Sequence, residues 1–375
     1  MHIAINTRLV LNGRMDGIGW FAAETSVRMA KAHPEHTFYF FFDRKPAKGL
    51  VDAPNIVPVV LCPQARHPVL WYLFFEWAVP IAIRKYKIDI FLSPDGMVPL
   101  HSKVPVLPVI HDLNFEHSSE NLKPSHQRYM TRWFPRFAHS ATRVVTVSEY
   151  SKHDIAVTYG IDESKIDVVY DGAHDRYRPH SNAEKAAIRR RFTGGSPYII
   201  FVSTILKRKN LANLLLAFDR LKDIEPGYLK LVVVGGRVWW QDELAAAYEG
   251  MRHKEDVIMP GRVEPDDLAG LVSAADALVY PSYFEGFGIP ILEAMYAETA
   301  VICSNTTSMP EVGGDAALYI DPSSPDDIAH AISMLHEGDT RKSLIEKGRI
   351  QREKFSWDRT TNLLWNSVLQ TIGKQ

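Results

Sequence analysis

The sequence predicts an α/β protein made of two doubly wound domains, on the basis of three observations. Short apolar runs of strand length alternate with longer runs of helix length over almost the whole chain, as in parallel sheets with crossover helices. A chain of 375 residues is longer than a single core usually supports. A polar stretch at 174–197, ending in Gly-Gly-Ser-Pro, separates two sets of strand-like runs.

Six strands are expected in each half, because each run is apolar and is bounded by turn residues. They lie at 2–7, 37–42, 55–61, 89–94, 104–112 and 143–148 in the first half, and at 198–204, 229–236, 256–261, 277–282, 300–304 and 316–321 in the second. In sheets of this kind, ligands bind at the carboxyl ends of the strands. The loops that follow the strands are therefore where a site is expected.

The composition argues against several classes of protein. A formal net charge of -1 gives no general reason to bind nucleic acid. The two cysteines, Cys62 and Cys303, lie in apolar runs and are expected to be small core residues in a reducing compartment. The N-terminus lacks the pattern of a secretion signal, and no uncharged apolar run reaches the roughly 18–20 residues that span a bilayer. We expect a cytoplasmic protein, located at most at the inner face of the membrane.

The stretch YFEGFGIPILEAM, residues 283–295, places two glutamates eight positions apart. Pro290 fits the first turn of a helix, so Glu285 is expected in the preceding loop and Glu293 about one turn into the helix. Glycines let a backbone approach a ligand closely, and a helix start favours an anion such as phosphate, while carboxylates accept from sugar or ribose hydroxyls. Taken alone, the spacing favours a simpler explanation, in which Glu293 complements the helix dipole and Glu285 is solvated.

Three further strand ends in the second half carry cations or glycines. The loop after the strand at 198–204 contains Lys207, Arg208 and Lys209, followed by Asn210 as a side-chain cap for the next helix. Cations beside a helix start suit a diphosphate. The other two strand ends carry Gly235, Gly236 and Gly261. A solvated basic face would explain the lysines but not the glycines, so together these loops predict a nucleotide-sugar site.

These motifs resemble those of the retaining glycosyltransferases of family 4, whose signature is two glutamates separated by seven residues. The match in SYFEGFGIPILEAM extends to TTSMPEVGGDAALYIDPSSPDDIAHAI, GRVEPDDLAGLVSAADALVYPS, VSEYSKHDI and IDVVYDGAHDRYRP. It covers most of residues 100–370, whereas the first hundred residues match loosely. The resemblance implies the GT-B fold, with two Rossmann-like domains facing a central cleft: an acceptor-binding domain at 1–180, rejoined by a C-terminal helix at 360–375, and a donor-binding domain at 181–359.

The resemblance also implies roles for residues of the second domain. Glu285 would contact hydroxyls of the transferred sugar, and Glu293 would hold the ribose. Lys209 with Arg208 would neutralise the leaving diphosphate. Residues 203–204 stand where many relatives carry an arginine, and we expect Lys209 to contribute more than Arg208. The other expected donor-binding residues are Gly286, Phe287, Gly288, Ile289, Gly235, Gly236, Val263 and Thr204.

Two stretches of the first domain are expected to reach the same site. VLPVIHDLNFEH puts His111 and Asp112 at a strand end, and the resemblance implies that this histidine lies beside the donor sugar and the acceptor. Without the resemblance, a polar pair there is often a cap. The segment after the first strand is expected to approach the acceptor or the donor phosphates through Arg8, Asp16, Gly17 and Gly19.

Other functions stay open at this point. Residues 17–22 also read as G-x-G-x-x-A, which makes a nicotinamide-dependent oxidoreductase the main alternative, although that fingerprint needs its first glycine directly after the strand. A sugar phosphorylase or a nucleotide-sugar epimerase is a further alternative on a similar scaffold. No D-x-D motif occurs in the chain, which disfavours the metal-dependent transferase fold, and we expect neither a metal nor another cofactor.

Two stretches of the first half suggest contact with a membrane. Residues 67–80 are densely aromatic, and residues 125–143 place Arg128, Arg132 and Arg136 on one helical face among aromatic side chains. Basic and aromatic residues together suit an anionic lipid surface or a lipid-linked acceptor. Helices that pack on the sheet, with arginine stems over aromatic rings, explain the pattern equally well.

The motifs together with the resemblance thus predict a glycosyltransferase, and the resemblance implies that it is a retaining one. It would move a sugar from a nucleoside-diphosphate sugar, which the resemblance implies to be GDP-mannose or a UDP-sugar, to a hydroxyl acceptor in polysaccharide or glycolipid synthesis. The expected partners are this donor, a saccharide or lipid-linked acceptor, and an anionic membrane surface, but no nucleic acid.

Overall fold

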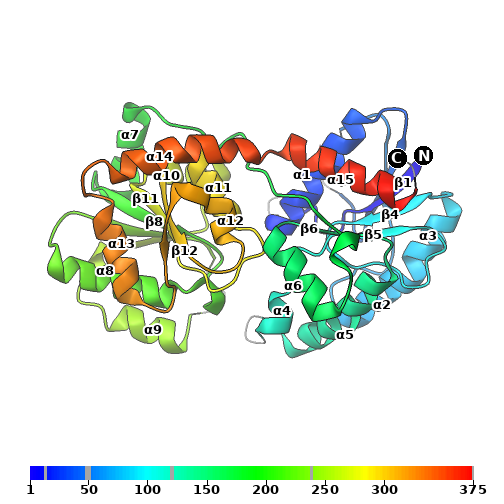
Figure 1. Cartoon of the computed structure of the whole chain (residues 1–375), viewed down its shortest axis with the longest axis horizontal. Helices are drawn as coiled ribbons and strands as arrows, with labels where there is room; N and C mark the ends of the chain where they lie inside the picture. Colours follow the sequence, from blue (N-terminus) through cyan, green and yellow to red (C-terminus); the bar gives the residue numbers. More distant parts are fainter. Residues whose placement is uncertain (12–14, 47–51, 119–121, 237–239, 374–375) are drawn as a thin grey trace. The chain divides into compact units, whose positions relative to one another are not determined.

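The computed structural model describes residues 1–11, 15–46, 52–118, 122–236 and 240–373. The chain forms two units (Figure 1), Met1–Asp171 with Trp357–Gln375, and Gly172–Ser356. The chain leaves the first unit after Asp171, nine positions before the boundary expected at 180, and re-enters it at Trp357, three positions before 360. The last helix, α15 (Trp357–Thr371), belongs to the first unit, as the sequence predicts.

The first unit is built on parallel strands. These are β1 (His2–Asn6), β2 (Thr37–Phe42), β3 (Ile56–Val60), β4 (Ile90–Ser93), β5 (Val106–Pro108), β6 (Val144–Thr146) and β7 (Ile166–Val168). Five of them pair in the order β3-β2-β1-β4-β5, and β6 pairs with β7. The backbone just after β5 pairs with β6, because Val109 forms a parallel bridge with Val145 and the Ile110 N–H donates to Val145 O at 2.8 Å.

Helices cover this sheet because its central strands are apolar on both faces. The helices are α1 (Gly17–Ala32), α2 (Pro68–Leu73), α3 (Val79–Lys85), α4 (Asn114–His117), α5 (Pro124–Ser140) and α6 (Glu149–Tyr159), with a π-helical turn η1 (Phe74–Ala78) between α2 and α3 and a 3-10 turn η2 (Glu163–Lys165). The returning helix α15 packs against α1. Arg28 of α1 pairs with Asp358 at 2.5 Å, and the rings of His33 and Trp365 stack at 3.8 Å.

The second unit contains one sheet of six parallel strands. These are β8 (Tyr198–Val202), β9 (Lys230–Val234), β10 (Val257–Gly261), β11 (Ala277–Tyr280), β12 (Ala300–Ser304) and β13 (Ala317–Ile320), in the order β10-β9-β8-β11-β12-β13. The chain therefore winds outward from β8 in one direction and from β11 in the other. The boundary between β8 and β11 is the topological switch point of the sheet, where α/β folds of this kind bind their ligands.

The helices of the second unit flank its sheet (Figure 1), and α8 and α13 pack against each other. They are α7 (Asn182–Thr193), α8 (Leu211–Ile224), α9 (Asp242–Glu249), α10 (Pro265–Ala274), α11 (Ile289–Tyr296), α12 (Met309–Gly313), α13 (Pro325–Met334) and α14 (Thr340–Gln351), with 3-10 turns η3 (Lys207–Lys209), η4 (Lys254–Asp256), η5 (Gly314–Ala316) and η6 (Arg352–Lys354). Every residue of β8 and of β12 is buried, as expected for strands covered on both faces.

All twelve expected strands are present, and two details differ from the predictions. The strand β7 was not predicted, because it is only three residues long and alternates a charged residue with apolar ones. Cys303 is buried as expected, but the prediction for Cys62 was wrong, since this residue lies beyond the end of β3 and is exposed. Within the described part of the chain, no helix is both long and apolar enough to span a bilayer.

Candidate functional site

The loops after β8 and β11 meet because these strands are neighbours at the switch point of the second sheet. The first loop carries Arg208 and Lys209 in the turn η3, and the second carries Glu285. Lys209 Nζ lies 2.5 Å from Glu285 Oε1 and donates to the Tyr280 hydroxyl at 2.9 Å. Arg208 Nη1 donates to Glu285 Oε2 at 3.1 Å and to Phe284 O at 2.7 Å.

This cluster is buried and carries excess positive charge. Only 7% of Lys209 and 6% of Glu285 is exposed. Burial by itself would raise the pKa of Glu285, but the charges of Lys209 and Arg208 outweigh it and lower that pKa to about 2. Two cations against one carboxylate leave a net charge of about +1. The side chains of Ser282 and Tyr280 also hydrogen-bond to this carboxylate.

Asn210 links the two loops instead of capping a helix. It lies at the N-cap position of α8 with a left-handed backbone (φ 57°), but its side chain makes no capping hydrogen bond, so that part of the prediction was wrong. Its amide instead donates to Pro281 O at 2.9 Å and to Pro322 O at 2.6 Å. The side chain therefore fixes the loop after β8 to those after β11 and β13.

Two hydroxyl residues hold the backbone of the Glu285 loop, and neither was singled out from the sequence. The Glu285 N–H donates to Thr307 Oγ1 at 3.2 Å. Ser308 Oγ donates to Glu285 O at 2.9 Å and to Phe287 O at 3.0 Å. Both residues follow β12, within the TTSMPEVGG stretch, where paired hydroxyl residues after a strand were the available signal.

The helix α11 begins immediately after this loop. Gly288 is its N-cap with φ 99°, a conformation that L side chains rarely adopt, and an added Cβ would lie 3.1 Å from Ile291 Cδ1. Ile289 and Pro290 form the first turn, as predicted. The first N–H groups of a helix have no partner within the helix, so this end favours an anion.

Glu293 lies one turn further along α11 and interacts with the start of the second unit. It accepts a hydrogen bond from the hydroxyl of Tyr177 and feels the charge of Arg176. Burial raises the pKa of Glu293 to about 7, against both of these partners, which lower it. This carboxyl group therefore changes its charge near neutral pH, whereas Glu285 stays ionised.

The glycines after β9 allow three loops to come together. The Gly235 N–H donates to Gly261 O at 3.0 Å, and the Ile205 N–H donates to Gly236 O at 3.0 Å. A Cβ on Gly235, whose φ is 150°, would lie 1.7 Å from Ser203 O. Thr204 and Val263 lie in the loops after β8 and β10, and both are partly buried.

The first unit has an ion pair at the equivalent point of its own sheet. Its switch point lies between β1 and β4. There Arg8 Nε lies 2.5 Å from Asp95 Oδ2, and both residues are buried. The Arg8 guanidinium also donates to Ala65 O at 3.2 Å and lies over the Trp71 ring at 5.8 Å. Arg8 is thus held by partners within the first unit.

His111 follows β5 and is fixed in one tautomer. Its Nε2 lies 2.9 Å from Pro94 O, and because a carbonyl only accepts, Nε2 carries the proton and Nδ1 is the acceptor. Burial lowers the pKa of His111, against the Pro94 hydrogen bond and the nearby Asp112, so the ring is neutral at pH 7. Phe21 of α1 packs edge-on against the ring at 5.0 Å.

The remaining residues predicted in the first unit have structural contacts. Asp16 is the N-cap of α1, and its Oδ1 accepts from the Gly19 N–H at 2.9 Å. Gly17 is the first residue of that helix, and a Cβ on Gly19 would lie 2.8 Å from Leu9 O. Asp112 Oδ1 accepts from the Asn114 N–H at 2.9 Å at the start of α4. Asp16 contributes to the electrostatic environment of His111, so the structure places these predicted residues near one another.

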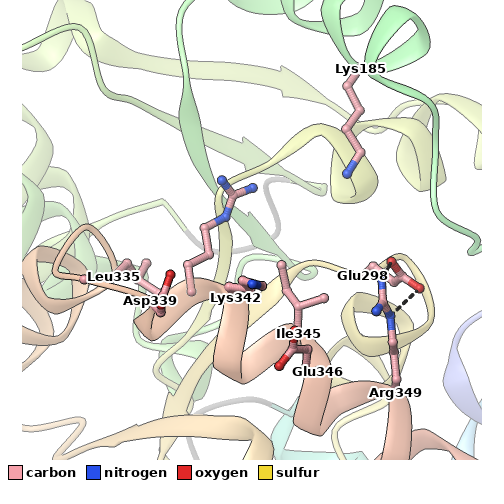
Figure 2. Close-up of a pocket in the computed structure, with 10 residues that line it drawn as sticks. Lys185, Glu298, Leu335, Asp339, Lys342, Ile345, Glu346 and Arg349 are labelled. Atoms are coloured by element: carbon pink, nitrogen blue, oxygen red, sulfur yellow. Dashed lines mark hydrogen bonds and ion pairs between the residues drawn. The ribbon is translucent and has the colours of Figure 1, made fainter.

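A separate pocket lies on the side of the second sheet where the strands begin, away from the loops of the candidate site (Figure 2). Its volume is about 540 Å³, and its walls include Lys185 of α7 and, in α14, Lys342 and Arg349. Arg349 forms a two-point pair with Glu298, at 2.8 and 2.5 Å, just before β12. None of the site residues predicted from the sequence lines this pocket. Since ligands of such sheets bind at the carboxyl ends of the strands, this pocket does not belong to the candidate site.

Among the described residues, no group of three or more potential ligands could hold a metal ion.

Two family profiles match the chain. "Glycosyl transferases group 1" matches residues 183–351, which lie in the second unit, and "Glycosyltransferase Family 4" matches residues 15–177. The chain is 32% identical over 288 residues to the O-antigen chain mannosyltransferase B of Escherichia coli, covering 76% of this chain and 75% of that protein. It is 27% identical over 289 residues to the O-antigen chain mannosyltransferase RfbU of Salmonella typhimurium, with the same coverage.

Solved structures share the fold over the whole chain. Sucrose-phosphate synthase from Thermosynechococcus elongatus is similar with a TM-score of 0.80 and 17% identity, covering 100% of this chain and 99% of that one. Anabaena HepE in complex with UDP-glucose is similar with a TM-score of 0.76 and 16% identity, covering 99% and 100%. The similarity to mannosyltransferases sets aside the oxidoreductase alternative that residues 17–22 had left open. The profiles, the relatives and the fold agree that the chain belongs to the family 4 glycosyltransferases and is a glycosyltransferase with the GT-B fold.

Proposed function

We propose that this glycosyltransferase transfers a sugar from a nucleoside-diphosphate sugar to a hydroxyl acceptor with retention of anomeric configuration. The observation that carries the proposal is the cluster of Lys209, Arg208 and Glu285 at the switch point of the second sheet, beside the start of α11. The cluster supplies positive charge for a diphosphate and carboxylate oxygens for sugar hydroxyls within one site.

In this proposal the second unit binds the donor. Gly286 and Phe287 in the loop, the N-cap Gly288 and the first helical residue Ile289 hold the diphosphate at the start of α11. Glu293 accepts from the ribose hydroxyls, and Glu285 accepts from the sugar. The loops that contain Gly235, Gly236, Val263 and Thr204 complete the nucleotide site.

In the same proposal the first unit binds the acceptor. His111 presents Nδ1 as a hydrogen-bond acceptor, and Asp112 lies next to it in the chain. The loop with Arg8, Asp16, Gly17 and Gly19 forms another wall of the acceptor site. Asp16 and Arg8 have structural partners, so we expect them to position this loop as well as to contact a ligand.

The chemistry that fits this arrangement is attack by the acceptor on the same face that the diphosphate leaves. The acceptor oxygen forms a bond to the anomeric carbon while the bond from that carbon to the phosphate oxygen breaks. The acceptor proton passes to the departing phosphate oxygen. Negative charge grows on the diphosphate in the transition state, where Lys209, Arg208 and the helix start stabilise it. A trapped covalent glycosyl-enzyme intermediate would overturn this route in favour of double displacement.

GDP-mannose and UDP-sugars are the proposed donors, and polysaccharide or glycolipid synthesis is the proposed process. Two of the relatives are named O-antigen mannosyltransferases, which supports a mannosyl donor, and HepE was crystallised with UDP-glucose, which supports a uridine donor. A saccharide or lipid-linked acceptor, a cytoplasmic location and contact with the inner face of the membrane belong to the same proposal.

Binding and product analysis test this proposal. Thermal unfolding is measured with UDP, GDP, ADP and NAD, since a ligand of the folded state raises apparent stability. We expect one nucleoside diphosphate to stabilise the protein selectively. The matching sugar donor is then incubated with acceptor candidates, and the anomeric configuration of the product is read by NMR. Stabilisation by NAD alone, or a product of inverted configuration, would contradict the proposal.

Glu293→Gln is expected to weaken binding of the nucleoside diphosphate about tenfold, because a hydrogen bond to a charged acceptor is worth roughly 1.5–3 kcal/mol. The pKa of Glu293 is raised from 4.5 to about 7, so the folded protein holds this proton more tightly than the unfolded chain does. The contribution of this bound proton to the free energy of unfolding is lost as the pH rises from about 4.5 to about 7. Wild-type affinity should therefore increase from about pH 6 to about pH 8 as the carboxylate forms, more than in Glu293→Gln.

Isothermal titration calorimetry at both pH values measures this difference. The ligand titrates identically in both proteins, so the comparison isolates the side chain. Glu298→Gln is the matched control, because Glu298 precedes β12 at the opposite edge of the same sheet. Equal pH dependence of wild type and Glu293→Gln would show that Glu293 does not bind the nucleotide.

A further inference from the structure

The pocket in Figure 2 lies within the second unit, between α7 and the segment that runs from the end of α13 into α14. Its volume of about 540 Å³ falls within the range of small-molecule sites, roughly 300–1,000 Å³. Leu335 and Ile345 contribute apolar surface. Four cations also line it: Lys185, Arg341, Lys342 and Arg349. We call this space the basic pocket.

Two guanidinium groups at the basic pocket share a single carboxylate. Oδ1 of Asp276, just before β11, accepts from Arg189 Nη2 at 3.0 Å and lies 3.3 Å from Arg341 Nη1. Backbone carbonyls fix both arginines further. Arg189 Nε donates to Ala274 O at 2.9 Å, and Arg341 Nε donates to Asp276 O at 3.0 Å. One carboxylate against two guanidinium groups leaves excess positive charge in a fixed place.

Lys185 brings a third cation to the same place. Its side chain is partly buried, and Figure 2 shows it extending from α7 toward α14. Burial lowers the pKa of Lys185, and the charges of Arg341 and Arg189 lower it further. Glu298 and Asp276 raise that pKa, but each contributes less than either arginine does. The ammonium group therefore lies in a positive potential, which a bound anion would relieve.

The acidic residues of the basic pocket do not cancel this charge. The Glu298 carboxylate is occupied by Arg349, at 2.8 and 2.5 Å. Asp339 and Glu346 are exposed, so solvent and salt screen their charges. In Figure 2, Glu346 points away from Lys185.

A solvated basic surface is the simpler explanation for these cations. It accounts for Lys342, which is exposed. It does not account for Lys185, because a lysine with a partly buried side chain is held beside two guanidinium groups that other contacts fix in place. Such an arrangement costs free energy unless an anion compensates it.

We propose that the basic pocket binds a small molecule that carries phosphate groups. A phosphate group has several negative oxygens, which accept from the ammonium groups of Lys185 on α7 and Lys342 on α14 together. A multiply charged anion is favoured over a single carboxylate, because the excess charge comes from several cations. The pocket is separate from the proposed donor site, so this proposal does not depend on the proposed reaction.

Isothermal titration calorimetry of the full chain with inorganic phosphate and pyrophosphate, at constant ionic strength, tests the proposal. We expect both anions to bind, and pyrophosphate to bind more tightly. Lys185→Gln should weaken pyrophosphate binding about tenfold, as expected for a lost hydrogen bond to a charged group. Lys342→Gln should weaken it about threefold, because this side chain is exposed.

Two controls separate the basic pocket from general charge and from the donor site. Arg190→Gln with Lys347→Gln removes two exposed cations from α7 and α14 that do not line the pocket, and it should bind pyrophosphate as the wild type does. The proposed donor site also suits pyrophosphate, so the titrations are repeated with Lys209→Met, in which that site has lost its buried cation. Binding at the basic pocket should persist there and should weaken when Lys185→Gln is added.

Chemical modification gives a local measurement. The rate of acetylation of each lysine is followed by mass spectrometry with and without pyrophosphate. Only the neutral amine reacts, and a bound anion both covers Lys185 and raises its pKa. Pyrophosphate should therefore slow the acetylation of Lys185 but not that of Lys347.

Four results would overturn the proposal. They are absence of phosphate and pyrophosphate binding, affinity unchanged by Lys185→Gln, an equal loss in the control with Arg190→Gln and Lys347→Gln, and equal protection of Lys347 from acetylation. Binding that disappears completely in Lys209→Met would assign the anion to the donor site instead.

Discussion

Lys209→Met is expected to lower the rate of glycosyl transfer at least a hundredfold, because it removes the buried cation that is proposed to face the leaving diphosphate. It should also lower the free energy of unfolding by about 2–3 kcal/mol. That is somewhat less than the roughly 3–5 kcal/mol typical of a broken buried ion pair, since Arg208 still pairs with Glu285. Steady-state kinetics and urea denaturation measure the two effects separately.

A second change separates the catalytic effect from the structural one. In the double variant Lys209→Met with Glu285→Gln, the buried carboxylate that has lost one of its two cations is removed as well, so part of the lost stability should return while transfer stays slow. The matched control is Lys207→Met, two positions away in the same turn, whose side chain is about one-third exposed. It should change stability by less than about 0.5 kcal/mol. Transfer that recovers together with stability in the double variant would show that Lys209 acts only on the fold.

Gly235→Ala is expected to destabilise the second unit by more than about 3 kcal/mol, beyond the range of most single substitutions. The new Cβ would lie 1.7 Å from Ser203 O, and both atoms are close to backbone that the neighbouring strands β8 and β9 hold in place. The loops after β8 and β9 would have to separate, and donor binding should weaken with them. Urea denaturation and the nucleotide titration measure these two consequences.

Gly261→Ala is the control for Gly235→Ala. Gly261 lies at the end of the next strand with φ 77°, but a Cβ there would have no neighbour within 4 Å. Gly261→Ala should therefore lower the free energy of unfolding only by the strain of a left-handed backbone, about 1–2 kcal/mol. Equal losses in the two variants would mean that the clash with Ser203 is relieved by a small movement.

Much of the fold could be predicted from the pattern of apolar runs. Strands such as β8 and β12 are apolar at nearly every position, because helices cover both faces of their sheet. The short β7 has no such run, and its pairing with β6 depends on the rest of the unit. Cys62 was assigned to the core because its neighbours are apolar, but β3 ends before it and leaves it exposed.

Side-chain roles at the site were only partly predictable. The sequence placed Asn210 at a helix start, and the structure shows its amide bound to two carbonyl groups of distant loops. Thr307 and Ser308 hold the loop of Glu285 from across the sheet. Local propensity contains no information on such contacts, because they depend on which loops become neighbours.

The sequence by itself determined the two α/β units, their strands, the glycine-bearing strand ends and the residue types of the site. The tertiary structure decided which of these residues meet. Lys209 and Glu285 are 76 positions apart, and Arg8 and Asp95 are 87 apart. Each pair forms because β8 neighbours β11, and β1 neighbours β4, so that loops after non-consecutive strands lie side by side. Strand order depends on the packing of the whole sheet, and for that reason no local stretch of sequence specifies it.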